Sequence, residues 1–182
     1  MPTLHIIEGP VGAGKTTYAI KLGKKVGSPP LVLDSWMATL FQADRPAANL
    51  WPWYAERKAR CVSQIMRLAR GALEHGNDVV IELGLIKAED RLQLYAELEG
   101  ETRDYLVHVL ETPREERKRR VRDRNVDKGE TFAMLVSDEV FEMASDMWEP
   151  IDELERQSRP EHFLNVDWSE CFAQLQTSAE HS

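Results

Sequence analysis

The feature that most constrains this chain is a glycine-rich segment near its start, Gly9-Pro10-Val11-Gly12-Ala13-Gly14-Lys15-Thr16, followed by Thr17. It fits the pattern G-x-x-x-x-G-K-[ST] at every fixed position. The apolar run at 4–8 before it is typical of a buried strand, and the apolar spacing over 17–26 after it predicts a helix. Strand, glycine loop and helix in this order form the context in which such a loop binds phosphate.

The chemistry of this segment predicts nucleoside triphosphate binding. Glycines let the backbone curl so that successive N–H groups face phosphate oxygens, and the helix N-terminus adds partial positive charge. Lys15 would reach the β- and γ-phosphates, and the Thr16 hydroxyl would hold Mg²⁺. We therefore expect ATP and Mg²⁺ to bind at residues 9–17. A glycine turn beside a solvated lysine is the alternative, and it requires the flanking strand and helix to be coincidental.

Short apolar runs alternate with helical patterns along the chain. The runs expected to be strands are 4–8, 31–33, 78–82, 105–110 and 162–166. Among the helices, a long one is expected at 53–75, after a turn at Trp51-Pro52-Trp53, and a final one at 168–175. The pattern predicts one α/β domain over 1–182 with a frayed tail from about 176. Its mainly parallel sheet would be covered on both faces and bind ligand beyond the carboxyl ends of its strands.

Charge is unevenly distributed. The chain has 182 residues and a net charge of −8, which weighs against a general nucleic-acid binder. Residues 113–125, however, hold seven Arg or Lys against three acidic residues. The chain shows no cationic leader and no apolar run long enough to span a membrane, so we expect a cytoplasmic protein without a membrane partner.

Asp34 is the first candidate for chemistry outside the glycine segment. It is expected to end the strand at 31–33 and open a loop that faces the γ-phosphate region. Phosphoryl transfer to an alcohol needs a carboxylate that orients the hydroxyl and accepts its proton. The alternative is an N-cap for a short helix at 36–41.

Glu82 ends the third apolar run and is a candidate for the Mg²⁺ site together with Thr16. A carboxylate at the end of a buried strand can hold the water shell of the ion. Asp34 could share this role. The alternative is an ordinary polar residue at a strand end.

The basic segment is expected to form a helical lid at about 113–130. Thr112-Pro113-Arg114-Glu115 would open its helix with a capping box and a proline at the first helical position. Arg117, Arg120 and Arg124 share one helical face and are expected to bind the nucleotide, with Arg120 and Arg124 stabilising charge during transfer. A solvated charged helix is the alternative.

An acceptor pocket is expected between the second and third strands. Its candidate residues are Asp34, Arg45, Trp53 and Arg57, because aromatic and arginine side chains there would overhang the acceptor side. The alternative places the tryptophan in the core and the arginines on the surface.

These motifs resemble those of the small P-loop kinases of bacteria, the group around chloramphenicol phosphotransferase, zeta-toxin kinases and the kinase domain of phage polynucleotide kinase. Such proteins are often labelled AAA-type ATP-binding proteins. The resemblance covers roughly residues 1–150 and rests on Gly9–Thr17, Asp34-Ser35, Glu82 and the spacing of Arg117, Arg120 and Arg124. It implies a five-stranded parallel sheet in the order 2-3-1-4-5, ATP as donor and Asp34 as base. Glu82 departs from the commoner aspartate, and 51–60 matches no acceptor motif.

The sequence thus favours an ATP-dependent phosphotransferase that acts on a hydroxyl of a small molecule. A polynucleotide 5′-hydroxyl kinase is one alternative, favoured by the basic segment. A nucleotide-dependent regulatory ATPase without an acceptor is another.

Overall fold

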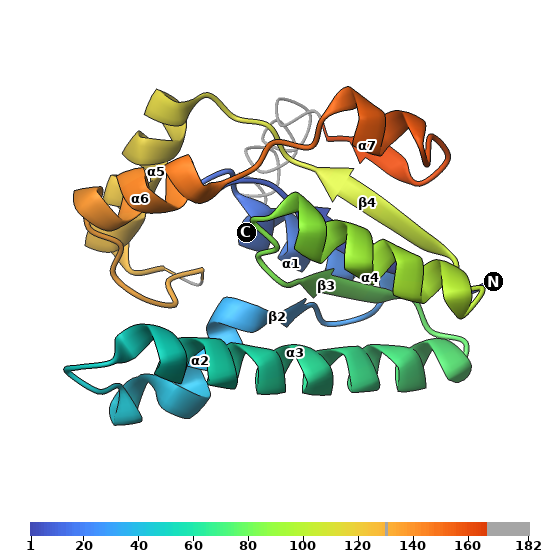
Figure 1. Ribbon diagram of the computed structural model, residues 1–182, viewed down its shortest axis with the longest axis horizontal. Helices are drawn as coiled ribbons and strands as arrows, with labels where there is room; N and C mark the ends of the chain where they lie inside the picture. The colour runs from blue at the N-terminus through green and yellow to red at the C-terminus, as the bar shows by residue number, and fades with distance from the viewer. Residues whose placement is uncertain (130, 167–182) are drawn as a thin grey trace, which may run out of the picture.

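A computed structural model describes residues 1–129 and 131–166 of the chain. Its centre is one parallel sheet of five strands in the order β2-β3-β1-β4-β5 (Figure 1). The strands are β1 (Leu4–Glu8), β2 (Leu31–Val32), β3 (Val79–Glu82), β4 (Tyr105–Val109) and β5 (Phe163–Asn165). The α/β class and the strand order implied by the resemblance are both confirmed.

Strand β1 lies at the middle of the sheet and is completely buried. Leu4 pairs with Val79 on one side and Tyr105 on the other, so the amino ends of β1, β3 and β4 are level. Because all strands run in parallel, the loops that follow them meet at a single edge.

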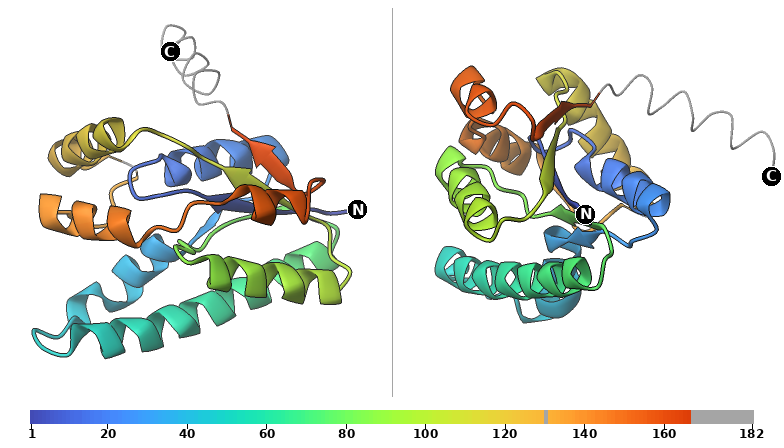
Figure 2. Two further views of the ribbon diagram at one scale, coloured as in Figure 1. Left: turned by 45° about the horizontal axis from the view of Figure 1, so that its top comes forward. Right: turned by 90° about the vertical axis from the view of Figure 1, so that its right-hand side faces the viewer.

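Helices cover both faces of the sheet (Figure 2). Helix α1 (Lys15–Val26) packs on one face, and α3 (Leu50–Glu74) and α4 (Ala88–Gly100) pack on the other. The remaining elements are α2 (Leu33–Phe41), η1 (Gln42–Asp44), α5 (Arg114–Asp127), α6 (Asp138–Met147) and α7 (Glu153–Gln157). Helices α5 and α6 lie side by side beyond the carboxyl edge of the sheet.

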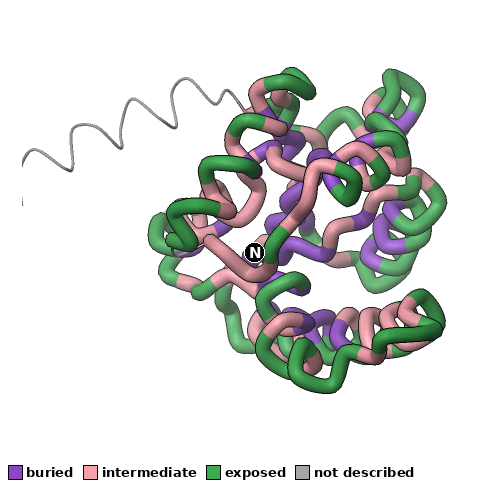
Figure 3. Tube along the Cα trace, turned by 90° about the vertical axis from the view of Figure 1, so that its left-hand side faces the viewer, coloured by how far each residue is buried: buried purple, intermediate pink, exposed green. Residues whose placement is uncertain are grey.

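The side-chain alternation of β1 divides the interior into two cores. Leu4 and Ile6 face the larger core against α3 and α4, whereas Ile7 joins Ala13 and Ala19 in a smaller core against α1. Buried stretches lie toward the inside of the molecule, and exposed stretches lie mostly along its rim (Figure 3). Burial on both faces explains why the strands read as apolar runs instead of alternating patterns.

The expectation that Asp34 ends the second strand is wrong. Strand β2 stops at Val32, opposite Glu82, where its only neighbouring strand also ends, so residue 33 has no strand partner. Helix α2 begins there and buries Leu33 and Met37, one helical turn apart, against the core. Asp34 therefore lies in the first turn of α2.

The turn expected at Trp51-Pro52-Trp53 is also wrong. Helix α3 begins at Leu50, and Pro52 lies within its first turn. A proline is tolerated there because the first amides of a helix have no intrahelical acceptor.

The predicted capping box of the basic helix does not form. Pro113 is the N-cap residue of α5, and no side chain caps that end. The carbonyl of Pro113 instead accepts the first backbone bond, from Arg117.

Two predictions, the helix at 168–175 and the frayed tail from about 176, lie outside the described residues. Within the described residues, no helix is both long and apolar enough to cross a membrane.

Candidate active site

The glycine loop between β1 and α1 forms the floor of the site. Gly9, Gly12 and Gly14 have φ angles of 150°, 76° and 93°, which side chains other than hydrogen rarely tolerate. A hydrogen bond from the Ala13 amide to the Pro10 carbonyl (3.2 Å) closes the turn. Gly14 is the N-cap of α1, and among the described residues no side chain caps that end by a hydrogen bond, so the first amides of α1 are available to an anion.

Lys15, Thr16 and Glu82 converge at the carboxyl edge of the sheet. The Thr16 hydroxyl donates to Glu82 Oε2 (2.8 Å), and Lys15 Nζ lies 3.8 Å from Glu82 Oε1. Lys15 Nζ also donates to the Pro10 carbonyl (3.1 Å). Residues 66 positions apart in the sequence are thus joined into one polar group. A hydroxyl and a carboxylate side by side are hard oxygen donors of the kind Mg²⁺ prefers.

The carboxyl of Glu82 is buried, and this burial raises its pKa. Lys15 acts in the opposite direction, as do the Thr16 hydrogen bond and Arg124, whereas Asp34 raises the pKa further. The charges of Asp34, Glu82 and Arg124 therefore all act within one neighbourhood, although they come from α2, β3 and α5.

Asp34 is solvent-exposed on the first turn of α2. The partial positive charge of a helix N-terminus stabilises a carboxylate at this position. Tyr54 of α3 lies within reach of this charge. Burial raises the pKa of its phenol to about 12, and the charge of Asp34 contributes to that rise.

The three arginines predicted to share a lid face have different surroundings. Arg124 lies at the last turn of α5, where burial lowers its pKa and the charges of Asp34 and Glu82 raise it. Within the described part of the chain, its Nε atom is buried without a hydrogen-bond partner. Arg120 donates from Nε to Glu116 (2.9 Å). Arg117 is buried and directed away from these carboxylates, toward the glycine loop and α6.

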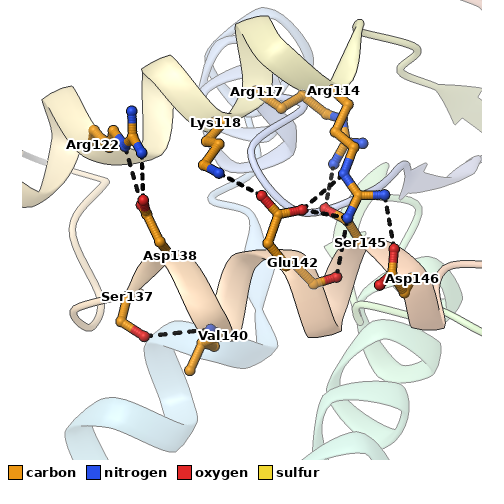
Figure 4. Close-up of polar contacts among 10 residues, drawn as sticks. All are labelled: Arg114, Arg117, Lys118, Arg122, Ser137, Asp138, Val140, Glu142, Ser145 and Asp146. Carbon is orange, nitrogen blue, oxygen red and sulfur yellow. Dashed lines mark hydrogen bonds and ion pairs between the residues drawn. The ribbon is translucent and has the colours of Figure 1, made fainter.

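Three other basic side chains of α5 form an ion-pair ladder with α6 (Figure 4). Arg114 pairs with Glu142 and Asp146, Lys118 pairs with Glu142, and Arg122 pairs with Asp138. Ser137 caps α6 by accepting from the Val140 amide (3.3 Å). The ladder ties the two helices into one unit and offsets much of the positive charge of the basic segment.

The residues predicted for the acceptor pocket are only partly brought together. The Arg57 guanidinium lies 4.5 Å from the ring centre of Trp53 and 5.8 Å from that of Phe41. It also donates to the Trp53 carbonyl (3.2 Å), so these residues form a cluster between α2 and α3. Arg45 is exposed after η1 and is not part of that cluster.

Several buried polar residues behind the site were not singled out from the sequence. Burial raises the pKa of Glu8, at the end of β1, to about 8, and neither of its oxygens has a partner among the described residues. His5 and His108 share a hydrogen bond (2.9 Å), and His108 also bonds the hydroxyl of Tyr18 on α1 (2.8 Å). The only available signal was an ionisable residue inside an otherwise apolar strand.

Solved structures share this fold at low sequence identity. A "putative kinase" from Chloroflexus aurantiacus has a TM-score of 0.66 at 15% identity, over 98% of this chain and 96% of its own. Kti12 from Chaetomium thermophilum, solved with ADP-AlF3, has a TM-score of 0.59 at 19% identity, over 91% and 89%. A gluconokinase from Sinorhizobium meliloti has a TM-score of 0.54 at 16% identity, over 91% and 82%. No curated protein sequence matches the chain significantly.

The fold and the glycine loop define a protein of the P-loop kinase-like class, which supports nucleotide-dependent phosphoryl transfer in general terms. The AAA_33 family, described as an AAA domain, matches residues 4–150. The chain belongs to this family.

Proposed function

We propose that the chain is an ATP-dependent phosphotransferase that moves the γ-phosphate to a hydroxyl group of a small molecule. The observation that carries the proposal is the convergence of Lys15, Thr16 and Glu82 at the carboxyl edge of the sheet, within electrostatic range of Asp34. The kinase fold of the solved neighbours supports it.

The glycine loop and Lys15 bind the triphosphate. Lys15 now bonds a loop carbonyl and neighbours Glu82, so its ammonium is already held above the loop. With ATP bound, the Lys15 ammonium would instead contact the β- and γ-phosphates. Thr16 and Glu82 are the residues that would hold Mg²⁺, which neutralises phosphate charge during transfer.

Asp34 is proposed as the general base. The acceptor oxygen forms a bond to the γ-phosphorus, and the bond from that phosphorus to the β–γ bridging oxygen breaks. The hydroxyl proton goes to the Asp34 carboxylate, and ADP leaves with the bridging oxygen. Exposure of Asp34 on the first turn of α2 leaves its oxygens accessible to an acceptor.

Arg124 is proposed to stabilise negative charge on the transferring phosphoryl group. Its guanidinium lies within the field of both carboxylates and has a buried Nε–H with no described acceptor. A phosphate oxygen would supply that acceptor. Arg120 is proposed to assist from the previous turn, and residues 113–130 to act as the lid.

The charge distribution favours a small-molecule acceptor over a polynucleotide. Three acidic residues of α6 pair with the basic helix: Asp138, Glu142 and Asp146. A surface built for a phosphate backbone would leave its cations free for several contacts.

Labelled ATP provides the test. The protein is incubated with γ-³²P-ATP and Mg²⁺, with pools of hydroxyl-bearing metabolites and antibiotics in one arm and a 5′-hydroxyl oligonucleotide in the other. Lys15→Ala protein is the matched control. A labelled small molecule supports the proposal, labelled oligonucleotide overturns the acceptor class, and release of inorganic phosphate alone, in every arm, overturns phosphoryl transfer.

A further inference from the structure

Arg117 differs from the other basic residues of α5 because it is buried, with only 7% of its surface exposed. Its guanidinium makes three hydrogen bonds, to the Val11 carbonyl (2.8 Å), the Ser145 hydroxyl (3.1 Å) and the Thr112 carbonyl (3.1 Å). It also lies 5.5 Å from the ring centre of Phe141, which is fully buried. Figure 4 shows Arg117 and Ser145 together between α5 and α6.

The bond to Val11 acts on the glycine loop itself. No peptide bond in the described chain is cis, so the Val11 carbonyl and the Gly12 amide point in opposite directions from one peptide plane. Arg117 holds that carbonyl on the α5 side of the loop. The Gly12 N–H is consequently turned away from Arg117.

The packing at Gly12 supports the same role. A Cβ atom built on Gly12 would lie 2.7 Å from the Arg117 carbonyl and 3.0 Å from a Val121 methyl group. The loop backbone therefore rests directly on α5. A peptide next to a glycine rotates more easily than one between two larger residues, and here the hydrogen bond to Val11 and the close packing at Gly12 both hold it.

The charge of Arg117 is also unusual. Its three hydrogen-bond acceptors are neutral, and burial lowers the pKa of its guanidinium, followed by the repulsion of Arg114. A buried cation without a carboxylate bonded to it adds positive potential at the loop from the α5 side, and this potential favours an anion bound on the opposite side of the loop.

We propose that Arg117 is a positioning residue that fixes the Val11–Gly12 peptide so that the Gly12 amide faces the bound phosphate. It acts through the loop instead of touching the nucleotide, and it couples the loop to α6 through Ser145. This inference rests on the proposed nucleotide binding but not on the identity of any acceptor.

The test combines ATP affinity with the NMR signals of two loop amides. Arg117→Met removes the charge and the bonds but keeps a long apolar side chain. Arg119→Met is the matched control. Arg119 lies two positions further along the same helix, is exposed and pairs with Glu116. ATP affinity is measured by calorimetry, and the ¹⁵N-labelled proteins are titrated with ATP to saturation.

We expect Arg117→Met to weaken ATP binding about tenfold or more, as for loss of a charge-assisted contact. At saturation, the ATP-induced shift of the Gly12 amide should shrink while that of Gly14 persists. Arg119→Met should match the parent in both respects, within about twofold in affinity.

Two results overturn the inference. Unchanged affinity with a full Gly12 shift would make Arg117 a packing residue only. Weakened affinity with a full Gly12 shift would mean direct contact with the nucleotide. If Arg117→Met does not fold, Arg117→Lys is judged by the same criteria, since one ammonium cannot reproduce the forked contacts. A parent chain that binds no ATP would overturn the proposed function as well.

Discussion

The two sides of the candidate site are built differently. On the nucleotide side, Lys15, Thr16 and Glu82 are joined to one another, and Arg117 holds the loop from behind. On the proposed acceptor side, Asp34 and Arg45 are exposed, and Trp53 and Arg57 form a separate, half-buried cluster with Phe41.

This difference indicates which ligand the fold is prepared for. A group already held in its working position loses little conformational entropy on binding, whereas an exposed group must be ordered by its ligand. We therefore expect nucleotide binding to be independent of the acceptor, and the acceptor side to be completed by the acceptor itself.

The largest effect should come from Lys15→Ala. Backbone amides cannot replace the ammonium charge, so phosphate turnover should fall roughly 10³-fold. The chain should still fold, because Lys15 belongs to the loop and to neither hydrophobic core, but its thermal stability should fall somewhat, since the buried Glu82 carboxyl loses its ion pair. Unimpaired turnover, measured with labelled ATP, would show that the glycine loop is not the nucleotide site.

Arg124→Ala should reduce turnover roughly 10²-fold, because α5 would lose the cation that interacts electrostatically with both Asp34 and Glu82. Arg122→Ala is the control. Arg122 lies on the same helix and pairs with Asp138 on the exposed ladder, so its loss should change both stability and activity little. Equal activities in the two variants would identify α5 as a structural helix without a catalytic end.

Glu82→Gln should act on the nucleotide side only. The amide retains the shape but supplies less charge for Mg²⁺, so MgATP affinity should weaken about tenfold and improve with added Mg²⁺. Calorimetry over a Mg²⁺ series measures this. Normal MgATP affinity with failed transfer would assign Glu82, and not Asp34, as the base.

The smallest effect concerns the buried histidine pair, His5 and His108, which is hydrogen-bonded to Tyr18 of α1. Burial, followed by the charge of His5, lowers the pKa of His108 to about 4. Between pH 6.5 and 4, the unfolded chain binds a proton at this residue that the folded chain does not. The free energy of unfolding should therefore fall with decreasing pH by up to about 1.4 kcal/mol per pH unit from this group.

Comparing His108→Phe with the parent isolates that contribution. Glu8 has a raised pKa and changes the free energy of unfolding with pH in the opposite direction. The test is therefore the difference between the pH slopes of the parent and of His108→Phe. Urea unfolding at several pH values should give a shallower acid-side decline for His108→Phe. Identical slopes would mean that the buried histidine pair does not control acid stability.

Most of the fold follows from local patterns. The apolar strands, the glycine loop and the helical spacing each specify one element, and parallel order places their carboxyl ends together. The start of α2 could not be read in this way, because it depends on where β3 ends beside β2. The start of α3 was misread because Pro52 is compatible with both a turn and a first helical turn.

The glycine loop at Gly9–Thr16 was predictable, because its glycine spacing is typical of one local structure, a loop between a strand and a helix. The roles of the arginines were not, because helical spacing places Arg117 and Arg124 on one face without saying what packs against that face. Arg117 meets Val11 and Ser145, which are 106 and 28 positions away in the sequence. Such contacts are set by tertiary packing and have no local signal.

The comparison between the two sides is tested most directly by Asp34→Asn. The amide keeps the shape and hydrogen bonding of Asp34 but cannot accept a proton, so transfer to the acceptor should fall by roughly 10²–10⁴-fold. Calorimetry should meanwhile give the MgATP affinity of the parent, because the nucleotide side is assembled without Asp34. Loss of MgATP binding in Asp34→Asn would contradict the division of the site into a prepared nucleotide side and a separate acceptor side.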